Sequence, residues 1–255
     1  MPSGSGIGHV DPVLMGEVKE LTEGQGRPVR LAIMVPSGDK WEADFALSLL
    51  SLTRYITWKP VCDDFDYMIV NERGSLITLQ RESMVKTALE NESVTHLLFL
   101  DSDMQFPPDL FHRLLGHDLP MVACNYVKRG IPATPNSKDL DGKVIATDRD
   151  STGLEEAESA GFGALLVKRE VFENTENPWF DTVWFVKEDE SIDLMGEDVF
   201  FFRKARRLGG YPLFIDHDLS QKIGHVGTYT YENWMCQTTL DVLADQEFEK
   251  QVMSK

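Results

Sequence analysis

The stretch THLLFLDSDMQFPP, residues 95–108, decides the fold of this chain. Its four consecutive apolar residues, Leu97 to Leu100, are bounded by polar ones and predict a strand that is buried on both faces. The pair Pro107-Pro108 cannot continue strand pairing, whereas proline suits the first turn of a helix. A buried strand followed by a helix indicates an α/β sheet. We therefore expect Asp101 and Asp103 at the carboxyl end of a central strand, where open α/β sheets bind their ligands.

The two acids in this stretch suggest a cation site. Asp101 and Asp103 project to the same side of an extended chain because one residue separates them. Their repulsion is relieved most readily by a divalent cation, and carboxylates completed by phosphate oxygens are typical ligands of Mg²⁺ or Mn²⁺. The alternative is a solvated acidic turn that caps a helix from Asp109 onward. The apolar strand before the acids and the proline pair after them favour the cation site.

Composition limits the classes of protein that fit. The chain has 255 residues, of which 42% are hydrophobic and 26% charged, and this is ample for one large α/β domain. A formal net charge of −17 argues against non-specific binding of nucleic acid, although it leaves room for one local basic groove. Cys62, Cys124 and Cys236 form neither a zinc pattern nor a disulfide framework, which favours a reducing compartment. No stretch approaches the ~20 apolar residues that span a bilayer, and no signal peptide is evident, so we expect a soluble, cytoplasmic protein.

Strands and helices alternate along the chain, which predicts a mostly parallel sheet with helices on its faces. Apolar runs predict strands at residues 29–35, 66–70, 74–79, 97–100, 120–126, 162–167 and 211–215. Helical spacing predicts helices at residues 41–52, 81–90, 199–208 and from 109 onward. Residues 127–159 are rich in Gly, Pro, Asp, Lys and Thr, and we interpret them as a long functional loop that carries a hairpin.

One domain is expected, since no linker divides two cores. Residues 1–27 are rich in glycine and acids and predict a flexible N-terminal segment. Residues 28–230 are the predicted domain. Residues 231–255, where acids alternate with Leu, Val and Phe at helical spacing, predict a C-terminal helical tail.

Several segments, taken in their order along the chain, resemble the family-2-like group of GT-A glycosyltransferases. The matching segments lie between residues 29 and 228 and are a strand ending near Pro36, an arginine opening a helix at Arg81, LLFLDSDM, VACNYVKR, GFGALLVKREVF, GEDVFF and IGHVG. Each segment is weakly specific by itself, but together and in order they make a fairly specific match. The resemblance implies a GT-A (Rossmann-like) α/β fold.

The resemblance also implies a divalent metal, Mn²⁺ or Mg²⁺, between the Asp-x-Asp motif and the diphosphate of a nucleotide-sugar. By analogy Asp103 is the direct metal ligand, while Asp101 contacts the ribose or a metal-bound water. His225, between two glycines, matches the late histidine that completes such metal sites. Its alternative is a hydrogen-bonded structural role, and His217 is a rival ligand. A fixed cation of this kind stabilises the charge on a leaving nucleoside diphosphate.

Glu197 and Asp198 match the acidic pair at the start of the helix beneath the acceptor pocket. In inverting members of the family the aspartate removes the acceptor hydroxyl proton, so we expect Asp198 to be the general base and Glu197 to position the acceptor. The alternative is ordinary helix N-terminal chemistry, because acids there favour the helix dipole whatever their function.

The remaining matches concern the donor. Arg81 matches an arginine that approaches the diphosphate or nucleobase, and its alternative is a surface ion pair with Glu82 worth under ~1 kcal/mol. The other residues that family or position assigns to donor binding are Pro36, Ser37, Asp66, Asp101, Ser102, Lys128 and Arg129. Glu82 stands where the family commonly has Asn, and residues 127–160 hold no motif that identifies the acceptor.

The predicted function is metal-dependent transfer of a sugar from a nucleotide-sugar, expected to be a UDP-sugar, to a hydroxyl acceptor with inversion. The class of acceptor stays open between a glycan, a lipid, a protein and a modified base of viral DNA. The net charge disfavours the DNA acceptor. A sugar-phosphate nucleotidyltransferase is a further alternative, but it needs a glycine-rich basic loop after the first strand. A binding module with a decayed site is disfavoured because Asp101, Asp103, Asp198 and His225 occur together.

Overall fold

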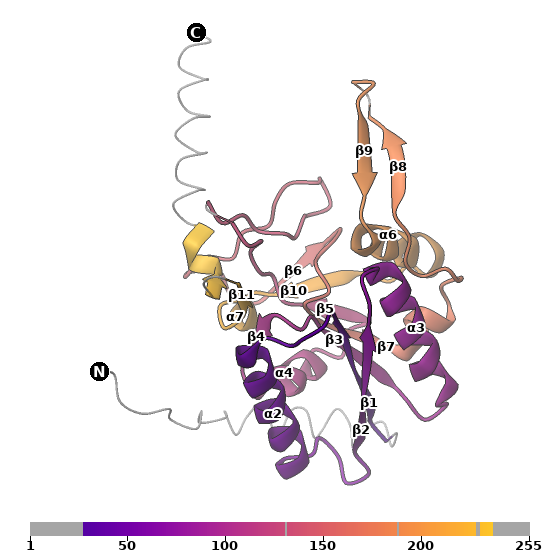
Figure 1. Cartoon of the computed structure of the whole chain (residues 1–255), viewed down its shortest axis with the longest axis vertical. Coiled ribbons are helices and arrows are strands. Elements are labelled where there is room, and N and C mark those ends of the chain that lie inside the picture. The colour runs from indigo at the N-terminus through magenta and orange to yellow at the C-terminus, as the bar shows by residue number, and fades with distance from the viewer. Residues whose placement is uncertain (1–27, 131, 188, 228–229, 237–255) are drawn as a thin grey trace.

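A seven-stranded sheet forms the centre of the structure, a computed structural model that describes residues 28–130, 132–187, 189–227 and 230–236 (Figure 1). The strands of this sheet are β1 (Arg30–Ser37), β2 (Asp66–Arg73), β3 (His96–Leu100), β5 (Met121–Ala123), β6 (Leu154–Ala157), β7 (Ala164–Lys168) and β10 (Leu213–Asp216). The helices are α2 (Ala43–Trp58), α3 (Ile77–Glu90), α4 (Leu110–Gly116), α5 (Arg169–Glu173), α6 (Glu197–Gly209), α7 (His217–Ser220) and the 3₁₀ helix η1 (Asn233–Cys236).

The strand order is β2-β1-β3-β7-β5-β10-β6. β1 pairs in parallel with β2 and β3, and β5 pairs in parallel with β10. β7 is antiparallel to both of its neighbours, and β6 is antiparallel to β10. β1, β2, β3, β5 and β10 therefore share one direction. The predicted α/β class, with a mostly parallel sheet flanked by helices, is confirmed.

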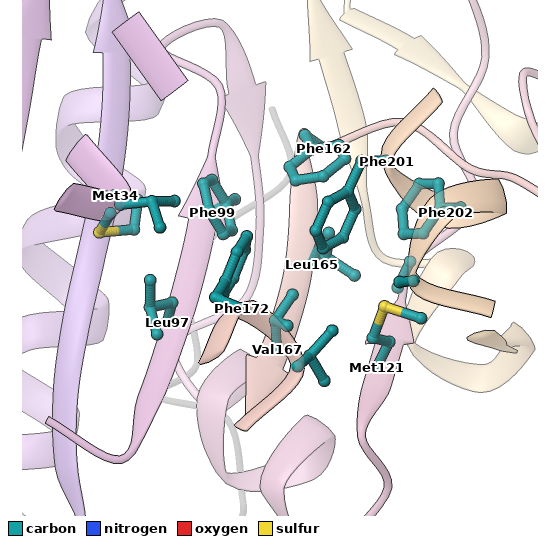
Figure 2. Close-up of a cluster of buried hydrophobic side chains, with 14 of the residues drawn as sticks. Met34, Leu97, Phe99, Met121, Phe162, Leu165, Val167, Phe172, Phe201 and Phe202 are labelled. Carbon is teal, nitrogen blue, oxygen red and sulfur yellow. The ribbon is translucent and has the colours of Figure 1, made fainter. Parts of the chain in front are cut away.

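Alternation along the central strands divides the core into two layers. In β3, Leu98 and Leu100 face one layer with α2 and α4, while Leu97 and Phe99 face the other with α3, α5 and α6. Figure 2 shows the second layer, where aromatic rings from distant parts of the chain meet. The centroid of the Phe99 ring lies 5.0 Å from that of Phe162, and the ring of Phe172 lies 5.0 Å from that of Phe201. This packing fixes β3 and α6 relative to each other.

Two smaller sheets complete the fold. β4 (Met104–Gln105), β11 (Gly224–Val226) and β12 (Thr230–Glu232) form a three-stranded sheet. β8 (Val183–Val186) and β9 (Ile192–Met195) form a hairpin that projects from the body of the molecule beside α6 (Figure 1). In the part of the chain that the structure describes, no helix is both long and apolar enough to cross a membrane.

The structure corrects the expected elements in two places. The predicted strand at 74–79 is wrong, because α3 already begins at Ile77, where Gln80, Met84 and Ala88 supply buried residues at helical spacing. The loop after Val127 contains isolated bridges, including Lys138 with Val144, but its end forms β6 and joins the edge of the central sheet. The predicted flexible segment 1–27 lies outside the described residues.

The described beginning of the predicted tail belongs to the folded domain. β12 pairs with β11, and the Asn233 side chain donates hydrogen bonds to the carbonyls of Asn125 (3.1 Å) and Ser220 (2.7 Å). The rest of the predicted tail, from residue 237, lies outside the described residues. The helix at 199–208 is confirmed as α6, and it ends as expected at Gly210, whose N–H donates to the carbonyl of Arg206 (2.9 Å).

Candidate active site

A polar cleft of about 410 Å³ lies at the carboxyl ends of β1 and β3 and the start of α6. This is the edge at which open α/β sheets bind ligands. The predicted site residues that line the cleft are Pro36, Ser37, Arg81, Asp101, Ser102, Asp103, Arg129, Glu197, Asp198 and His225.

The acidic turn after β3 is held by its backbone. The carbonyls of Asp101, Ser102 and Asp103 accept hydrogen bonds from the N–H groups of Met104 (3.1 Å), Glu42 (3.1 Å) and Val226 (2.7 Å), respectively. The last of these bonds ties the turn to β11, where His225 lies opposite Met104 in the strand register. The pairing of β4 with β11 therefore brings a histidine far along the chain beside Asp103.

Arg81 joins the acidic turn to the start of α6. Its guanidinium is buried, donates to Asp101 Oδ1 at 3.1 Å and to Glu197 Oε1 at 2.6 Å, and lies 4.6 Å from the centroid of the Phe162 ring. Burial raises the pKa of Asp101 and Arg81 opposes that rise, while the neighbouring charge of Asp103 adds to it. The geometry gives Arg81 a bracing role, because both of its terminal nitrogens are already engaged with carboxylates.

Asp103 lies between two cationic or potentially cationic groups. Its Oδ2 is 3.2 Å from Arg129 Nη1 and 3.4 Å from His225 Nε2. Burial would raise the pKa of Asp103, but the hydrogen bond and charge of His225, together with the charge of Arg129, lower it overall. Asp103 is thus the carboxylate of the turn that stays ionised most readily.

His225 is oriented by a backbone carbonyl. Its Nδ1 lies 2.9 Å from the carbonyl oxygen of Val127, which can only accept, so Nδ1 carries a proton. Nε2 is thus the ring nitrogen that faces Asp103, and a metal ion bound there would take the place of the Nε2 proton. The Tyr126 ring packs edge-on against the imidazole at 5.4 Å between centroids.

These residues fit a divalent cation that takes most of its ligands from a substrate. Asp103 and His225 offer one oxygen and one nitrogen donor side by side, and such mixed donors suit Mn²⁺. Among the described residues no group of three or more His, Cys, Asp or Glu side chains forms a metal cluster. The remaining ligands would therefore be phosphate oxygens and water, as is usual for cations that bind nucleotides.

Asp198 occupies the first turn of α6, next to Glu197, and lines the same cleft as the acidic turn. Its Oδ1 accepts a hydrogen bond from the N–H of Val199 at 2.7 Å. Burial is the largest cause that raises the pKa of Asp198, followed by the charge of Glu197, and these outweigh the hydrogen bond and Arg81. A carboxylate with a raised pKa accepts a proton more readily than an ordinary aspartate.

Sequence reasoning missed Tyr126 as part of the site. Tyr126 lines the cleft, its hydroxyl accepts a hydrogen bond from the N–H of Gly163 at 3.2 Å, and burial raises the pKa of this hydroxyl. A Cβ on Gly161 would lie 2.0 Å from the Tyr126 hydroxyl oxygen, and one on Gly163 would lie 2.9 Å from the ring. The two glycines around Phe162 were the available signal, because they leave the space that the tyrosine occupies.

Two predicted donor residues do not join the site. Asp66 does not line the cleft, because it begins β2 opposite Arg30 at the amino ends of parallel strands, on the other edge of the sheet. Lys128 is exposed and does not line the cleft, unlike its neighbour Arg129.

The rival metal ligand His217 is also remote from the cleft. It is buried, its Nδ1 lies 2.9 Å from the Thr147 hydroxyl, and its Nε2 lies 2.9 Å from a carboxylate oxygen of Glu155. It therefore fixes the end of the long loop against α7 and β6.

No family model matches the chain, and no curated protein sequence matches it. Among solved structures, it is similar to A197 from STIV, with 21% identity and a TM-score of 0.50 over 78% of this chain and 86% of that chain. It is also similar to GalNAc-T7, solved with UDP, GalNAc and Mn²⁺, with 12% identity and a TM-score of 0.47 over 81% of this chain and 45% of that one. At these identities the likeness to A197 concerns the fold alone, and the weaker second match adds no argument about function.

Proposed function

We propose that the chain is a metal-dependent glycosyltransferase that moves a sugar from a nucleotide-sugar to a hydroxyl group, with inversion at the anomeric carbon. The observation that carries this proposal is the joining of two acidic centres in one cleft by Arg81, which contacts Asp101 at 3.1 Å and Glu197 at 2.6 Å. One centre suits a cation with a diphosphate, and the other suits proton removal. UDP as the nucleotide rests on the family resemblance.

The donor side would be formed by the acidic turn and the end of β1. A Mn²⁺ or Mg²⁺ ion held by Asp103 and His225, with Asp101 beside it, would neutralise the charge that develops on the leaving nucleoside diphosphate. Arg129 pairs with Asp103 but is half exposed, so its guanidinium can turn toward the diphosphate. Pro36 and Ser37 would form the wall beside the nucleotide, with the Ser37 hydroxyl fixed by Asn71 Nδ2 at 2.9 Å.

The acceptor side would be formed by Asp198 and Glu197. Asp198 would take the proton from the acceptor hydroxyl while that oxygen forms a bond to the anomeric carbon. The bond from the anomeric carbon to the diphosphate breaks in the same reaction, and the nucleoside diphosphate leaves with the electron pair. Glu197, fixed by Arg81, would hold the acceptor in the orientation that this attack requires.

The nucleotidyltransferase alternative gains no support. Such an enzyme needs a basic loop after the first strand, but Lys40 points to Glu42 at 3.7 Å and does not line the cleft.

Release of UDP from a panel of UDP-sugars with Mn²⁺, water serving as acceptor, tests the proposal without knowledge of the natural acceptor. We expect one donor to be turned over, and Asp103→Asn to reduce its turnover by about 10²-fold or more, since a charge-stabilising contact in the transition state is lost. Asp66→Asn, at the other edge of the sheet, is the matched control and should leave turnover unchanged. Full turnover by Asp103→Asn, or pyrophosphate release from a nucleoside triphosphate and sugar phosphate, would contradict the proposal.

A further inference from the structure

The β8–β9 hairpin carries an apolar face that no described residue covers. Trp184 pairs with Leu194 and Val186 with Ile192, so these four side chains share one face of the hairpin. Their exposed fractions are 69% for Trp184, 44% for Leu194, 68% for Val186 and 68% for Ile192. Contiguous exposed apolar side chains of this size mark a place where something binds. We call these four residues the hairpin face.

The hairpin is also isolated from the main sheet. Its two strands pair only with each other among the described strands, and it extends beyond α6 in Figure 1. A two-stranded hairpin is marginally stable alone in water, so contact with a partner would strengthen it. Its outer backbone N–H and C=O groups can pair with an added strand.

The position of the hairpin relates it to the acceptor. β9 ends at Met195, and Gly196 alone separates it from Glu197 and Asp198 at the start of α6. The hairpin is therefore joined directly to the helix start that carries the proposed base. The donor groups lie on the other side of Arg81.

Charge around the hairpin limits the kind of partner. The turn between its strands carries Asp189 and Glu190, and the one lysine described there, Lys187, is paired with Asp193 at 2.6 Å. With a chain charge of −17, this surface repels nucleic acid and anionic lipid. It attracts a partner that carries basic groups.

A second copy of the chain fits less well. Stable interfaces use about 20–30 residues on each side, whereas the hairpin face has four residues. A second copy would also bring the same acidic turn close to this one. An uncharged hydrocarbon chain would match the apolar side chains but would leave the open strand edges and the acidic turn unused.

We propose that the hairpin face binds the acceptor, and that the acceptor is an extended polypeptide segment with aliphatic and basic residues around a serine or threonine. Aliphatic side chains would cover the hairpin face, basic ones would meet the acidic turn, and the backbone would add to an open strand edge. The proposal rests on the proposed function. In the transfer, the serine or threonine oxygen bonds to the anomeric carbon, its proton goes to Asp198, and the nucleoside diphosphate departs with the electrons of the broken bond.

Fluorescence anisotropy with labelled synthetic peptides tests this binding directly. The probe is a short peptide of alternating Val and Lys around a central Ser, compared with the same peptide bearing Glu for Lys and with one bearing Ser for Val. We expect the Val/Lys peptide to bind, and both altered peptides to bind at least about tenfold more weakly, a difference of about 1.4 kcal/mol.

A surface variant shows whether the hairpin face is the site. Trp184→Ser combined with Ile192→Ser should lower the binding affinity for the Val/Lys peptide at least about tenfold, because buried aromatic contacts dominate such interfaces. Trp58→Ser, which changes an equally exposed tryptophan on α2, is the control and should leave binding unchanged. Both variants should keep the wild-type melting temperature.

Other occupants give distinct results that would overturn the proposal. Binding to phosphatidylcholine vesicles but not to peptide would identify a lipid surface, and a dimer that the hairpin variant dissociates would identify a second copy. Absence of peptide binding would also overturn it. UDP binding in the presence of Mn²⁺ is measured on the same samples. If the wild-type protein binds no UDP, the proposed transferase function is contradicted. If it binds UDP but not the peptide, only the proposed acceptor is contradicted.

Discussion

The acidic turn and the β8–β9 hairpin flank the same helix start but are built in opposite ways. The turn is fixed by backbone hydrogen bonds and by buried Arg81, so few of its groups can move independently. The hairpin exposes apolar side chains and pairs only with itself among the described strands. The proposed donor chemistry therefore depends on the core, whereas the proposed recognition of the acceptor depends on a surface that can change without disturbing the fold.

The largest effect should come from the proposed base, where the two regions meet. Asp198→Asn removes the proton acceptor, and we expect turnover with the natural acceptor class to fall about 10²- to 10⁴-fold. UDP binding should persist, because the proposed metal and diphosphate contacts are made by Asp103, His225 and Arg129. Steady-state turnover and UDP titration on the same preparation check this, and an equal loss of both would place Asp198 on the donor side instead.

Arg81→Met should show how strongly the acidic turn depends on the core. It leaves the carboxylates of Asp101 and Glu197 without their shared cation, and we expect a loss of about 3 kcal/mol in the free energy of unfolding. This is the lower end of the usual range because both carboxylates keep some contact with water. Urea unfolding measures it. Arg206→Met, which breaks a surface pair with Glu156, is the control and should cost under ~1 kcal/mol.

Gly161→Ala tests the packing beneath the cleft. The new Cβ would lie 2.0 Å from the Tyr126 hydroxyl oxygen and 2.4 Å from Asn136 Nδ2, so we expect a loss of about 1–3 kcal/mol. Gly38→Ala is the matched control, since nothing lies within 4 Å of its added Cβ. Equal unfolding midpoints for the two variants would show that Tyr126 is not held in this position.

The pH dependence of turnover should separate the two acids. The pKa of Asp198 is raised above the ordinary aspartate value of 3.8. As pH falls, Asp198 therefore loses its ionised, proton-accepting form at a higher pH than an ordinary aspartate does. The lowered pKa of Asp103 means that its contribution to stability persists to more acidic pH and is lost only as pH falls through its own folded-state pKa. A pH–rate profile and acid unfolding on the same protein check the order: activity should fall before stability does.

The smallest effect should be on the hairpin. Trp184→Ser should change the free energy of unfolding by less than ~0.5 kcal/mol, because the side chain is exposed and belongs to neither layer of the core. Trp179→Ser is the contrasting variant and should cost about 3–5 kcal/mol, since Trp179 is buried and its Nε1 donates to the carbonyl of Thr175 at 2.8 Å. Similar losses in thermal unfolding would erase the distinction between the two regions.

Much of the acidic turn could be predicted from sequence because its chemistry is local. A buried strand ending in Asp101-Ser102-Asp103 and a helix opening with Glu197-Asp198 each carry their own pattern, and the structure places them in one cleft. The assignment of Asp66 to the site conflicts with the strand pattern, because the predicted strand at 66–70 begins at Asp66 and ligands bind at the carboxyl ends of such strands. The pairing of Asp66 with Arg30 places it at the opposite edge of the sheet.

Contacts between distant residues could not be predicted in the same way. The role of Arg81 depends on two carboxylates, one of them 116 positions along the chain. The space beneath Tyr126 depends on Gly161, which belongs to a different segment. The hairpin was missed because Val183 to Val186 has the composition of a buried segment, whereas the structure leaves it exposed.

The most direct test of the account is a titration with Mn²⁺, followed by electron paramagnetic resonance, with and without UDP. Asp103 and His225 supply few ligands themselves, so we expect weak Mn²⁺ binding alone and much tighter binding with UDP, and each ligand should strengthen the other to the same extent. Asp103→Asn and His225→Gln should each weaken the UDP-dependent binding, whereas Asp66→Asn should not. Mn²⁺ binding that ignores UDP, or that survives both substitutions, would contradict the account.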